Sequence, residues 1–404
     1  MNKAIKEWYE KNTSDVVALS REIWAYPELA LQEYRACKVS AKYLKKWGFS
    51  VEEFNVKGEG EPNAIRATWG TGKPVIGIIG EYDALMDLGQ EAVPYQAPIP
   101  GPGHGCGHNL MGAGCAAAAA GLKAVMESEN LPGTVVYLAC TAEETVEGKL
   151  YMNEAGYFDD LDIGLAWHPV GKLPRVVEAS PTASGGWIFE FFGKTAHAAA
   201  EPAEGRSALD AAELMNIGVQ YLREHTTEDT RIHYSYLSAG GAANVVPEYA
   251  ALNYIIRSKD FVNYELLVER VKKVAKGAAM MTETEEEVEF AREMYKNVLG
   301  EDAPEDSSEF LRVHLEELTG VVTREPGSTD LTWVAHTCPT AWIFGFGNVL
   351  GFPGHHWSTT ALGGMSIGEK GAIYAGKPLA QCGYEMLVDT AKGDSCWKAF
   401  HEEV

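Results

Sequence analysis

Short apolar segments alternate with longer segments of helical spacing in the first part of this chain. The segment from Val75 to Gly80 reads Val-Ile-Gly-Ile-Ile-Gly, and such an unbroken apolar run is typical of a strand buried on both faces. The segments Thr134 to Ala139 and Ile163 to Trp167 have the same character. Strands that alternate with helices predict a parallel or mixed sheet covered on both sides. We therefore expect an α/β fold with a mixed sheet and helices on both faces.

Three helices are expected around this sheet. Apolar residues recur at helical spacing from Lys3 to Tyr26, just before Pro27, and again from Tyr34 to Trp47. The third segment, Leu110 to Met126, is rich in alanine and glycine and is interrupted by Lys123. We interpret it as a packed core helix, because a membrane span needs roughly twenty strongly apolar residues.

The pattern changes between Gly186 and Glu289. Here the expected order is strand, helix, strand, strand, helix, strand, which is the split βαβ or ferredoxin-like arrangement. A chain of 404 residues is long for one core, which also favours two domains. We predict an inserted α+β domain at residues 184–295 and a discontinuous first domain at residues 1–183 and 296–404.

After the inserted domain, the chain is expected to return to the first domain. We predict a helix at Ser308 to Leu318, a strand at Ala341 to Phe346 and a largely helical end from Ser366 to Lys392. These elements would complete the sheet and its helical cover.

Charge and cysteine content narrow the possible partners. The chain has 34 Lys+Arg against 57 Asp+Glu, a formal net charge of -23, which disfavours nucleic acid and anionic membranes. Seven cysteines without regular spacing argue against a disulfide framework and fit a reducing compartment. The segment Met1 to Val17 has no apolar stretch, so we expect neither a signal peptide nor a membrane anchor. A cytoplasmic protein is the prediction.

Acidic and histidine side chains follow one expected strand after another. Ligands of open α/β sheets bind outside the carboxyl ends of the strands, so these positions are candidates for a site. They are Glu81, Tyr82 and Asp83 after the first strand, then Glu143 and Glu144, then His168, and finally His355 and His356 near the C-terminus. Solvated loop charge could explain one such position, whereas the whole series favours a metal site.

A glycine-rich stretch, Pro102 to Asn109, carries a cysteine and two histidines within five positions. Glycines allow the tight turns that bring neighbouring side chains together. Cys106 and His108 are of the residue types that bind zinc or a similar metal best. A glycine turn with a buried thiol is the alternative on this stretch alone, because free cysteine is often buried for packing.

Several motifs together resemble a known family, the dinuclear metallo-amidohydrolases that include aminoacylases, auxin–amino acid hydrolases and aminobenzoyl-glutamate hydrolase. They lie along nearly the whole chain: Gly-Glu-Tyr-Asp-Ala-Leu (80–85), Gly-His-Gly-Cys-Gly-His-Asn-Leu (103–110), Thr-Ala-Glu-Glu (141–144), Trp-His-Pro (167–169), a His-Ala-Ala segment (197–208), Asn-Val-Val-Pro (244–247) and Gly-Ser-Thr-Asp (327–330). The Glu-Tyr-Asp-Ala-Leu and Trp-His-Pro forms are similar to the aminobenzoyl-glutamate hydrolase branch.

The resemblance implies a site with two divalent metal ions per chain, zinc or manganese. The implied ligands are Cys106, His108, Glu144, His168 and His355, with His356 as the alternative to the last. Glu143 would be the general base, which takes a proton from water and returns it to the leaving amine. Glu143 and Glu144 can serve different roles because adjacent residues leaving a strand project in opposite directions. Asp83 would orient a metal ligand.

The inserted domain carries three further residues that the resemblance assigns to the site. His197 would stabilise the oxyanion from the neighbouring protomer, which implies a homodimer formed through this dimerisation or lid domain. Asn244 and Arg257 would grip a substrate carboxylate, a task that suits the planar fork of arginine. A capped loop histidine and a surface arginine are the structural alternatives.

We therefore predict a metal-dependent hydrolase that cleaves the amide bond of a small N-acyl or N-aroyl amino acid. A dipeptidase or an aryl-amine hydrolase with the same centre is the alternative among enzymes, and a catalytically silent metal-binding relative is the alternative outside them. The chain departs from the family at Thr141, where relatives often have proline, and at residues 145–148, which lack a glycine-rich continuation. We expect the first departure to alter the loop rather than the chemistry.

Overall fold

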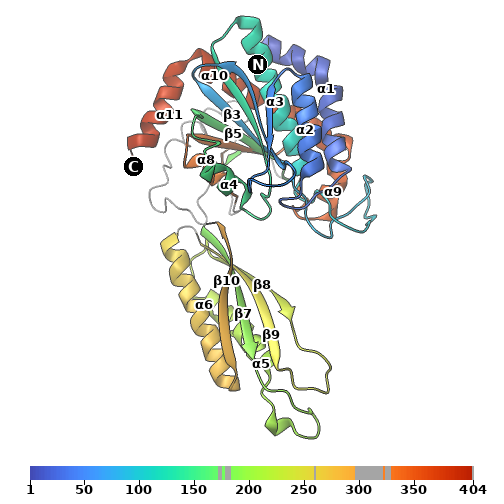
Figure 1. Ribbon diagram of the computed structural model, residues 1–404, viewed down its shortest axis with the longest axis vertical. Helices are drawn as coiled ribbons and strands as arrows, with labels where there is room; N and C mark the ends of the chain where they lie inside the picture. Colours follow the sequence, from blue (N-terminus) through green and yellow to red (C-terminus); the bar gives the residue numbers. More distant parts are fainter. Residues whose placement is uncertain (172–174, 178–182, 259–260, 296–321, 324–328, 403–404) are drawn as a thin grey trace. The chain divides into compact units, whose positions relative to one another are not determined.

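A computed structural model describes residues 1–171, 175–177, 183–258, 261–295, 322–323 and 329–402 (Figure 1). The chain divides into two compact units. Unit 1 comprises Met1–Ser180, Pro304–Glu325 and Thr329–Val404, and unit 2 comprises Pro181–Ala303 and Pro326–Ser328. The predicted inserted domain falls within unit 2. The helix expected at Ser308 to Leu318 and the first two residues of the Gly-Ser-Thr-Asp motif lie outside the described residues.

Unit 1 contains an eight-stranded sheet in the order β1-β2-β4-β3-β5-β12-β6-β11. Its central strands β4, β3, β5 and β12 run parallel, whereas β1, β2 and β6 pair antiparallel, so the sheet is mixed as predicted. The strands are β1 Ser50–Phe54, β2 Ala64–Thr71, β3 Val75–Glu81, β4 Gly133–Cys140, β5 Ile163–His168, β6 Arg175–Val177, β11 Val322–Thr323 and β12 Thr340–Phe344.

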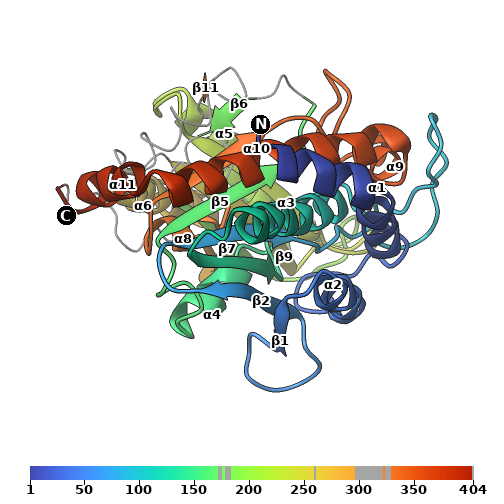
Figure 2. The same ribbon diagram turned by 90° about the horizontal axis from the view of Figure 1, so that it is seen from above.

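Helices cover both faces of this sheet, as Figure 2 shows from above. They are α1 Lys3–Trp24, α2 Tyr34–Lys46, α3 His108–Glu129, α4 Gly148–Glu154, α8 Thr332–Ala335, α9 Trp357–Gly363, α10 Ser366–Val388 and α11 Thr390–Glu402. Alternate residues of β3 serve the two layers: Ile76 and Ile78 belong to the core with α1, α3 and α10, whereas Val75 and Ile79 belong to the core on the opposite face. The α/β expectation is confirmed.

Helix α3 lies at the centre of the larger core. It is long and apolar enough to cross a membrane by length and composition, yet 89% of its apolar window is buried inside the protein. Its alanines and glycines allow close packing: a side chain at Gly114 would meet the Trp167 ring at 2.9 Å and the Ala372 carbonyl at 3.0 Å. The predicted core helix is therefore present, and its first turn carries His108.

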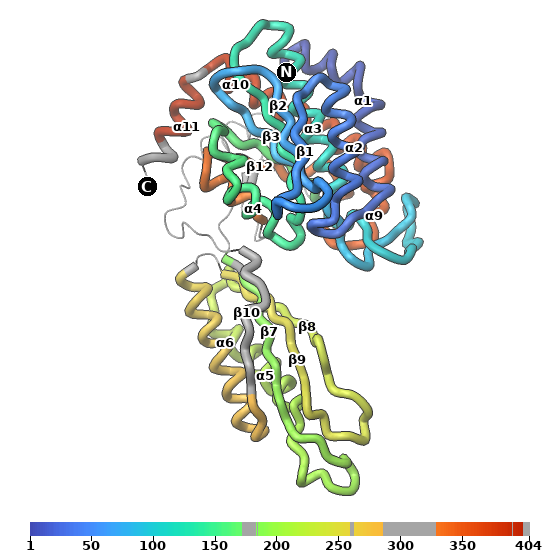
Figure 3. Tube along the Cα trace, in the orientation of Figure 1, coloured from blue at the N-terminus to red at the C-terminus, as the bar shows by residue number. Residues whose placement is uncertain are grey.

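Unit 2 is a four-stranded antiparallel sheet in the order β10-β7-β9-β8 with two helices. Its elements are β7 Ala183–Phe192, α5 Ala208–Arg223, β8 Arg231–Ser238, β9 Tyr249–Ser258, α6 Phe261–Thr282 and β10 Glu285–Tyr295. Buried residues of α5 and α6, such as Met215 and Val271, form one core with Phe189 and Leu252 of the sheet. This is the predicted ferredoxin-like arrangement, and the chain path through it can be followed in Figure 3.

Candidate metal centre

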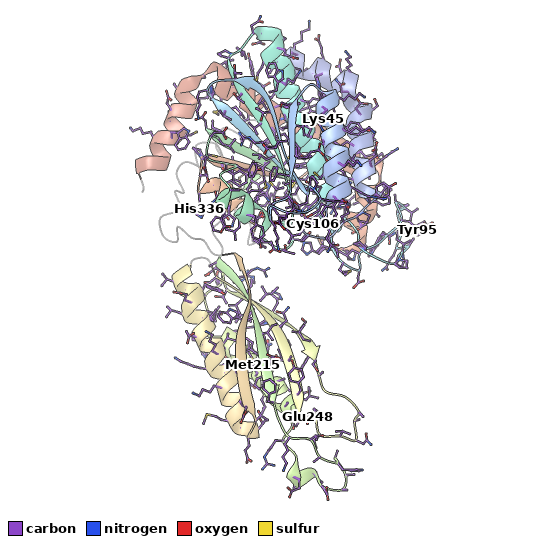
Figure 4. The ribbon with its side chains drawn as sticks, viewed as in Figure 1. Lys45, Tyr95, Cys106, Met215, Glu248 and His336 are labelled. Atoms are coloured by element: carbon purple, nitrogen blue, oxygen red, sulfur yellow. The ribbon has the colours of Figure 1, made fainter. Side chains whose placement is uncertain are left out.

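The site lies where the parallel strands of unit 1 end. Glu81 is the last residue of β3 and His168 is the last residue of β5, while Glu143 and Glu144 follow the end of β4. Because these strands are parallel neighbours, their carboxyl ends share one edge of the sheet. Cys106, labelled in Figure 4, comes to the same edge on the loop before α3.

Gly107 shapes the loop that presents Cys106 and His108. Its φ of +84° is left-handed, and an added Cβ would meet Pro169 at 2.8 Å. Glycine therefore allows this loop to pack against the residue that follows His168. As a result, the Cys106 Sγ lies 3.3 Å from the His168 Nε2.

Asp83 orients two of the predicted metal ligands. One oxygen, Oδ1, lies 2.8 Å from the Nδ1 of His108, and the other, Oδ2, accepts a hydrogen bond of 2.8 Å from the Glu144 backbone N–H. Burial alone would raise the pKa of Asp83, but His108 lowers it below its ordinary value. An ionised Asp83 holds the His108 ring with Nδ1 toward itself, which leaves Nε2 for an ion.

The two adjacent glutamates approach different histidines. Glu143 Oε2 lies 3.8 Å from the His108 Nε2, whereas Glu144 Oε2 lies 3.4 Å from the His355 Nε2. His355 is tied to the glycine-rich loop by a 2.8 Å hydrogen bond from its backbone N–H to the Gly105 carbonyl. The His356 Nδ1 lies 2.8 Å from the Ser358 hydroxyl at the start of α9. This geometry favours His355 over His356 as a ligand.

Three overlapping sets of side chains bring possible ligand atoms within 4.8 Å of one another. They are Cys106, His108 and His168; Cys106, Glu144 and His355; and Glu81, His108 and Glu143. The first two sets contain all five predicted ligands. The third contains Glu81, to which the sequence assigned no role.

The donor chemistry of the centre fits divalent ions. The described residues offer no hydrogen-bond partner to four buried atoms, namely Glu81 Oε2, His108 Nε2, Glu144 Oε1 and His168 Nδ1. Burial raises the pKa of Glu144 to about 7, and burial together with Glu81 raises the pKa of Glu143 well above its ordinary value. Such crowded, buried carboxylates require compensating positive charge. Imidazole, thiolate and carboxylate ligands together suit zinc and similar metals.

The structure separates the three predicted site residues of unit 2. His197 pairs with Val245 in an isolated bridge, and the Ala198 N–H donates to the Asn244 carbonyl at 3.0 Å. His197 and Asn244 therefore lie together, beyond the Tyr249 end of β9. Arg257 lies at the other end of this strand, opposite Ser184 of β7. At about 3.3 Å per residue, the 10 residues of β9 span about 30 Å.

Glu33 is a site-supporting residue that the sequence did not indicate. Its buried carboxylate accepts hydrogen bonds from the Thr141 hydroxyl and, at 2.7 Å, from the Ala142 backbone N–H. Ala142 has a left-handed φ of 55°, a conformation that alanine rarely adopts. Glu33 thus holds the turn that presents Glu143. The expected loop change at Thr141 has a concrete form here, since proline has no hydroxyl to donate.

The stability of the metal-free protein is expected to fall as the pH rises toward 8. Burial, with Asp83 nearby, raises the pKa of Glu33 from an ordinary 4.5 to about 8. Folding therefore favours the protonated acid, and this contribution is complete below pH 4.5 and lost as the pH passes through about 8. Glu33→Gln should flatten the profile over this interval. Thermal unfolding of metal-free protein at successive pH values measures it, and parallel profiles for both proteins would contradict the assignment.

Comparisons with known proteins agree with this geometry. The model of peptidase family M20/M25/M40 matches residues 77–361. One of the p-aminobenzoyl-glutamate hydrolase subunits of Escherichia coli is 33% identical over 96% of this chain and 92% of its own. The Xaa-Arg dipeptidase of Mus musculus is 31% identical over 80% of this chain and 74% of its own.

The fold has close counterparts among solved structures. A dinuclear metal-binding peptidase from the M20 family of Bacillus subtilis superposes with a TM-score of 0.67 at 19% identity, covering 94% of this chain and 99% of its own. Together with the family match over most of the chain, these similarities settle the classification. The chain belongs to peptidase family M20/M25/M40 and is a metal-dependent amide hydrolase.

Proposed function

We propose that this protein hydrolyses the amide bond of an N-acyl or N-aroyl amino acid, such as an aminobenzoyl-glutamate-like compound. The observation that carries the proposal is the cluster of Cys106, His108, Glu144, His168 and His355 with Glu143 beside it. The 33% identity to the p-aminobenzoyl-glutamate hydrolase protein of Escherichia coli supports this substrate class. The similarity to the Xaa-Arg dipeptidase favours dipeptides as the second candidate.

The roles of the chain's own residues follow from their positions. Cys106, His108, Glu144, His168 and His355 would hold two divalent ions, zinc or manganese. When bound, such ions polarise a carbonyl and make water acidic enough to ionise near neutral pH. Glu143, buried next to His108, accepts the proton of the attacking water and returns it to the leaving amine. Asp83 keeps His108 and Glu144 in place.

We further propose a homodimer whose active sites combine residues of both chains. His197 and Asn244 lie beyond one end of β9 and Arg257 at the other, about 30 Å away, so one copy of unit 2 does not gather all three around a small substrate. The sheet order leaves β8 at an edge, where Tyr236 and Leu237 are exposed. An edge strand offers free N–H and C=O groups for pairing with a second copy.

Assembly with a different protein is the alternative. The similar Escherichia coli protein is named as one component of a hydrolase with several kinds of chain, and another component of that hydrolase is also similar to this chain, at 30% identity over 55% of it. Sedimentation or light scattering of the protein purified alone distinguishes a homodimer from a chain that needs a second protein. For location we propose the cytoplasm, in keeping with seven cysteines that all remain free.

Two divalent ions per chain are the expected result of elemental analysis. The reason is that the five proposed ligands form two sets that share Cys106. Protein purified without chelator, or reconstituted with Zn²⁺ or Mn²⁺, should bind both ions, and removal by a chelator should abolish hydrolysis. Fewer than one ion per chain after reconstitution would contradict the centre.

The substrate proposal is tested by a screen with the metal-loaded protein. Acyl-amino acids, aroyl-glutamates and dipeptides are offered in parallel, and kcat/KM is compared across the three classes. Preference for aroyl-glutamates supports the first proposal, and preference for dipeptides supports the second. Full metal loading without hydrolysis of any class would favour a catalytically silent metal-binding relative.

A further inference from the structure

Lys149 is a lysine whose side chain is wholly buried beside the metal centre. Its Nζ lies 2.6 Å from the Glu81 Oε1 and 2.5 Å from the Asp330 Oδ1, and all three side chains have an exposed fraction of 0%. The Lys149 backbone N–H also donates to the Asp330 Oδ2 at 2.8 Å. Burying three charges is costly unless the geometry is good, so this cluster calls for a role.

The cluster joins three segments that are distant in sequence. Glu81 ends strand β3, Lys149 lies in α4 directly after the loop of Glu143 and Glu144, and Asp330 comes just before α8. The loop closes tightly ahead of Lys149, because an added Cβ at Gly148 would lie 1.7 Å from the Thr141 carbonyl oxygen. Lys149 therefore enters the site from a fixed direction, and Asp330, the last residue of the Gly-Ser-Thr-Asp motif, holds it there.

The two oxygens of Glu81 have different surroundings. Oε1 is taken by Lys149, whereas Oε2 has no hydrogen-bond partner among the described residues. Oε2 instead lies 3.5 Å from the Nε2 of His108, the ring nitrogen that Asp83 leaves available for an ion. Glu81, His108 and Glu143 together form the third set of possible ligand atoms.

We propose that Lys149, anchored by Asp330, is a positioning residue that turns the second carboxylate oxygen of Glu81 toward the metal centre. Glu81 then adds a charged oxygen beside the ion held by His108. The inference rests on the dinuclear centre proposed above and adds to it a residue outside the five predicted ligands. The competing explanation is that the ion cluster serves folding alone.

The experiment measures metal affinity and metal-free stability separately. Zn²⁺ and Mn²⁺ are titrated into metal-free protein in competition with a chelating dye, and thermal unfolding is recorded without metal. Glu81→Gln keeps an amide oxygen for Lys149 but removes the charge, and Lys149→Met removes the anchor at similar length. Each should weaken the binding of one ion by about 10- to 100-fold, the usual effect of losing a group that supports a metal ligand.

Two further variants separate positioning from folding. Lys45→Met is the matched control, because it breaks a lysine–glutamate pair of the same unit that is partly exposed, and both ions should bind as before. Lys149→Met combined with Asp330→Asn removes the uncompensated acid. This double variant should regain thermal stability relative to Lys149→Met, yet it should still bind one ion weakly because Glu81 remains without its anchor.

The possible outcomes distinguish this inference from the proposed function. If the unchanged protein binds neither ion, the dinuclear centre itself fails. If it binds two ions and Glu81→Gln binds them equally well, only the present inference is overturned. Loss of stability without loss of metal affinity in Lys149→Met, or recovery of affinity in the double variant, would also overturn it. Glu81→Gln retains the hydrogen bond to Lys149, so the test survives if Lys149→Met does not fold.

Discussion

Replacement of Glu143 by glutamine is expected to lower kcat by at least about a hundredfold, the lower end of the range for general acid–base catalysis. Glutamine has nearly the same shape as glutamate but cannot accept a proton from water. Glu143 belongs to neither of the two ligand sets that share Cys106, so both ions should still bind. Steady-state kinetics and elemental analysis of the same preparation measure the two effects.

The control for this variant is Glu154→Gln, an exposed glutamate at the end of α4. It makes the same chemical change a short distance along the chain and should leave kcat unaltered. Near-normal turnover of Glu143→Gln would remove the residue from the role of base. A large loss of metal instead would identify Glu143 as a ligand.

Mixing two inactive variants is expected to restore activity. His197→Ala lacks the oxyanion donor that unit 2 is proposed to contribute, and Glu143→Gln lacks the base of unit 1. If each site combines unit 1 of one chain with unit 2 of its partner, a mixed dimer has one site with both residues intact. Random exchange makes about half of the dimers mixed, so about a quarter of wild-type activity should return.

A second mixture provides the control for this complementation. Cys106→Ser and Glu143→Gln both alter unit 1, so no site in their mixed dimer is complete and activity should stay absent. Native mass spectrometry with one isotopically labelled chain shows whether mixed dimers have formed. Absence of activity from the first mixture, although mixed dimers are present, would mean that His197 acts within its own chain or has no part in the reaction.

Local sequence patterns predicted most of the architecture. The apolar run at Val75 to Gly80 is strand β3, and the order of elements in the inserted domain is the observed ferredoxin-like sheet. Both patterns are local, since side-chain periodicity and breaker residues act over a few neighbours. Short elements such as β6 and α8 were not predicted, because three or four residues carry too little periodicity and gain their stability from tertiary packing.

The clustering of the proposed ligands could also be expected from the sequence. Glu81, Glu144 and His168 follow parallel strands, and parallel strands deliver their carboxyl ends to one edge. Sequence could not decide how the two glutamates divide between His108 and His355. That division depends on the left-handed turn at Ala142, which is held by Glu33 from a position 109 residues away.

What the sequence by itself determined is thus the fold class, the order of the elements and the types of ligand at the strand ends. Tertiary structure alone decided the partners of buried charges and the separation of the unit 2 residues. Lys149 meets Asp330 across 181 residues, a pairing that no local pattern encodes. Arg257 and His197 are separated because β9 is extended, so one copy of the chain holds them about 30 Å apart. Contacts between distant residues depend on the packing of the whole chain, whereas periodicity depends only on neighbours.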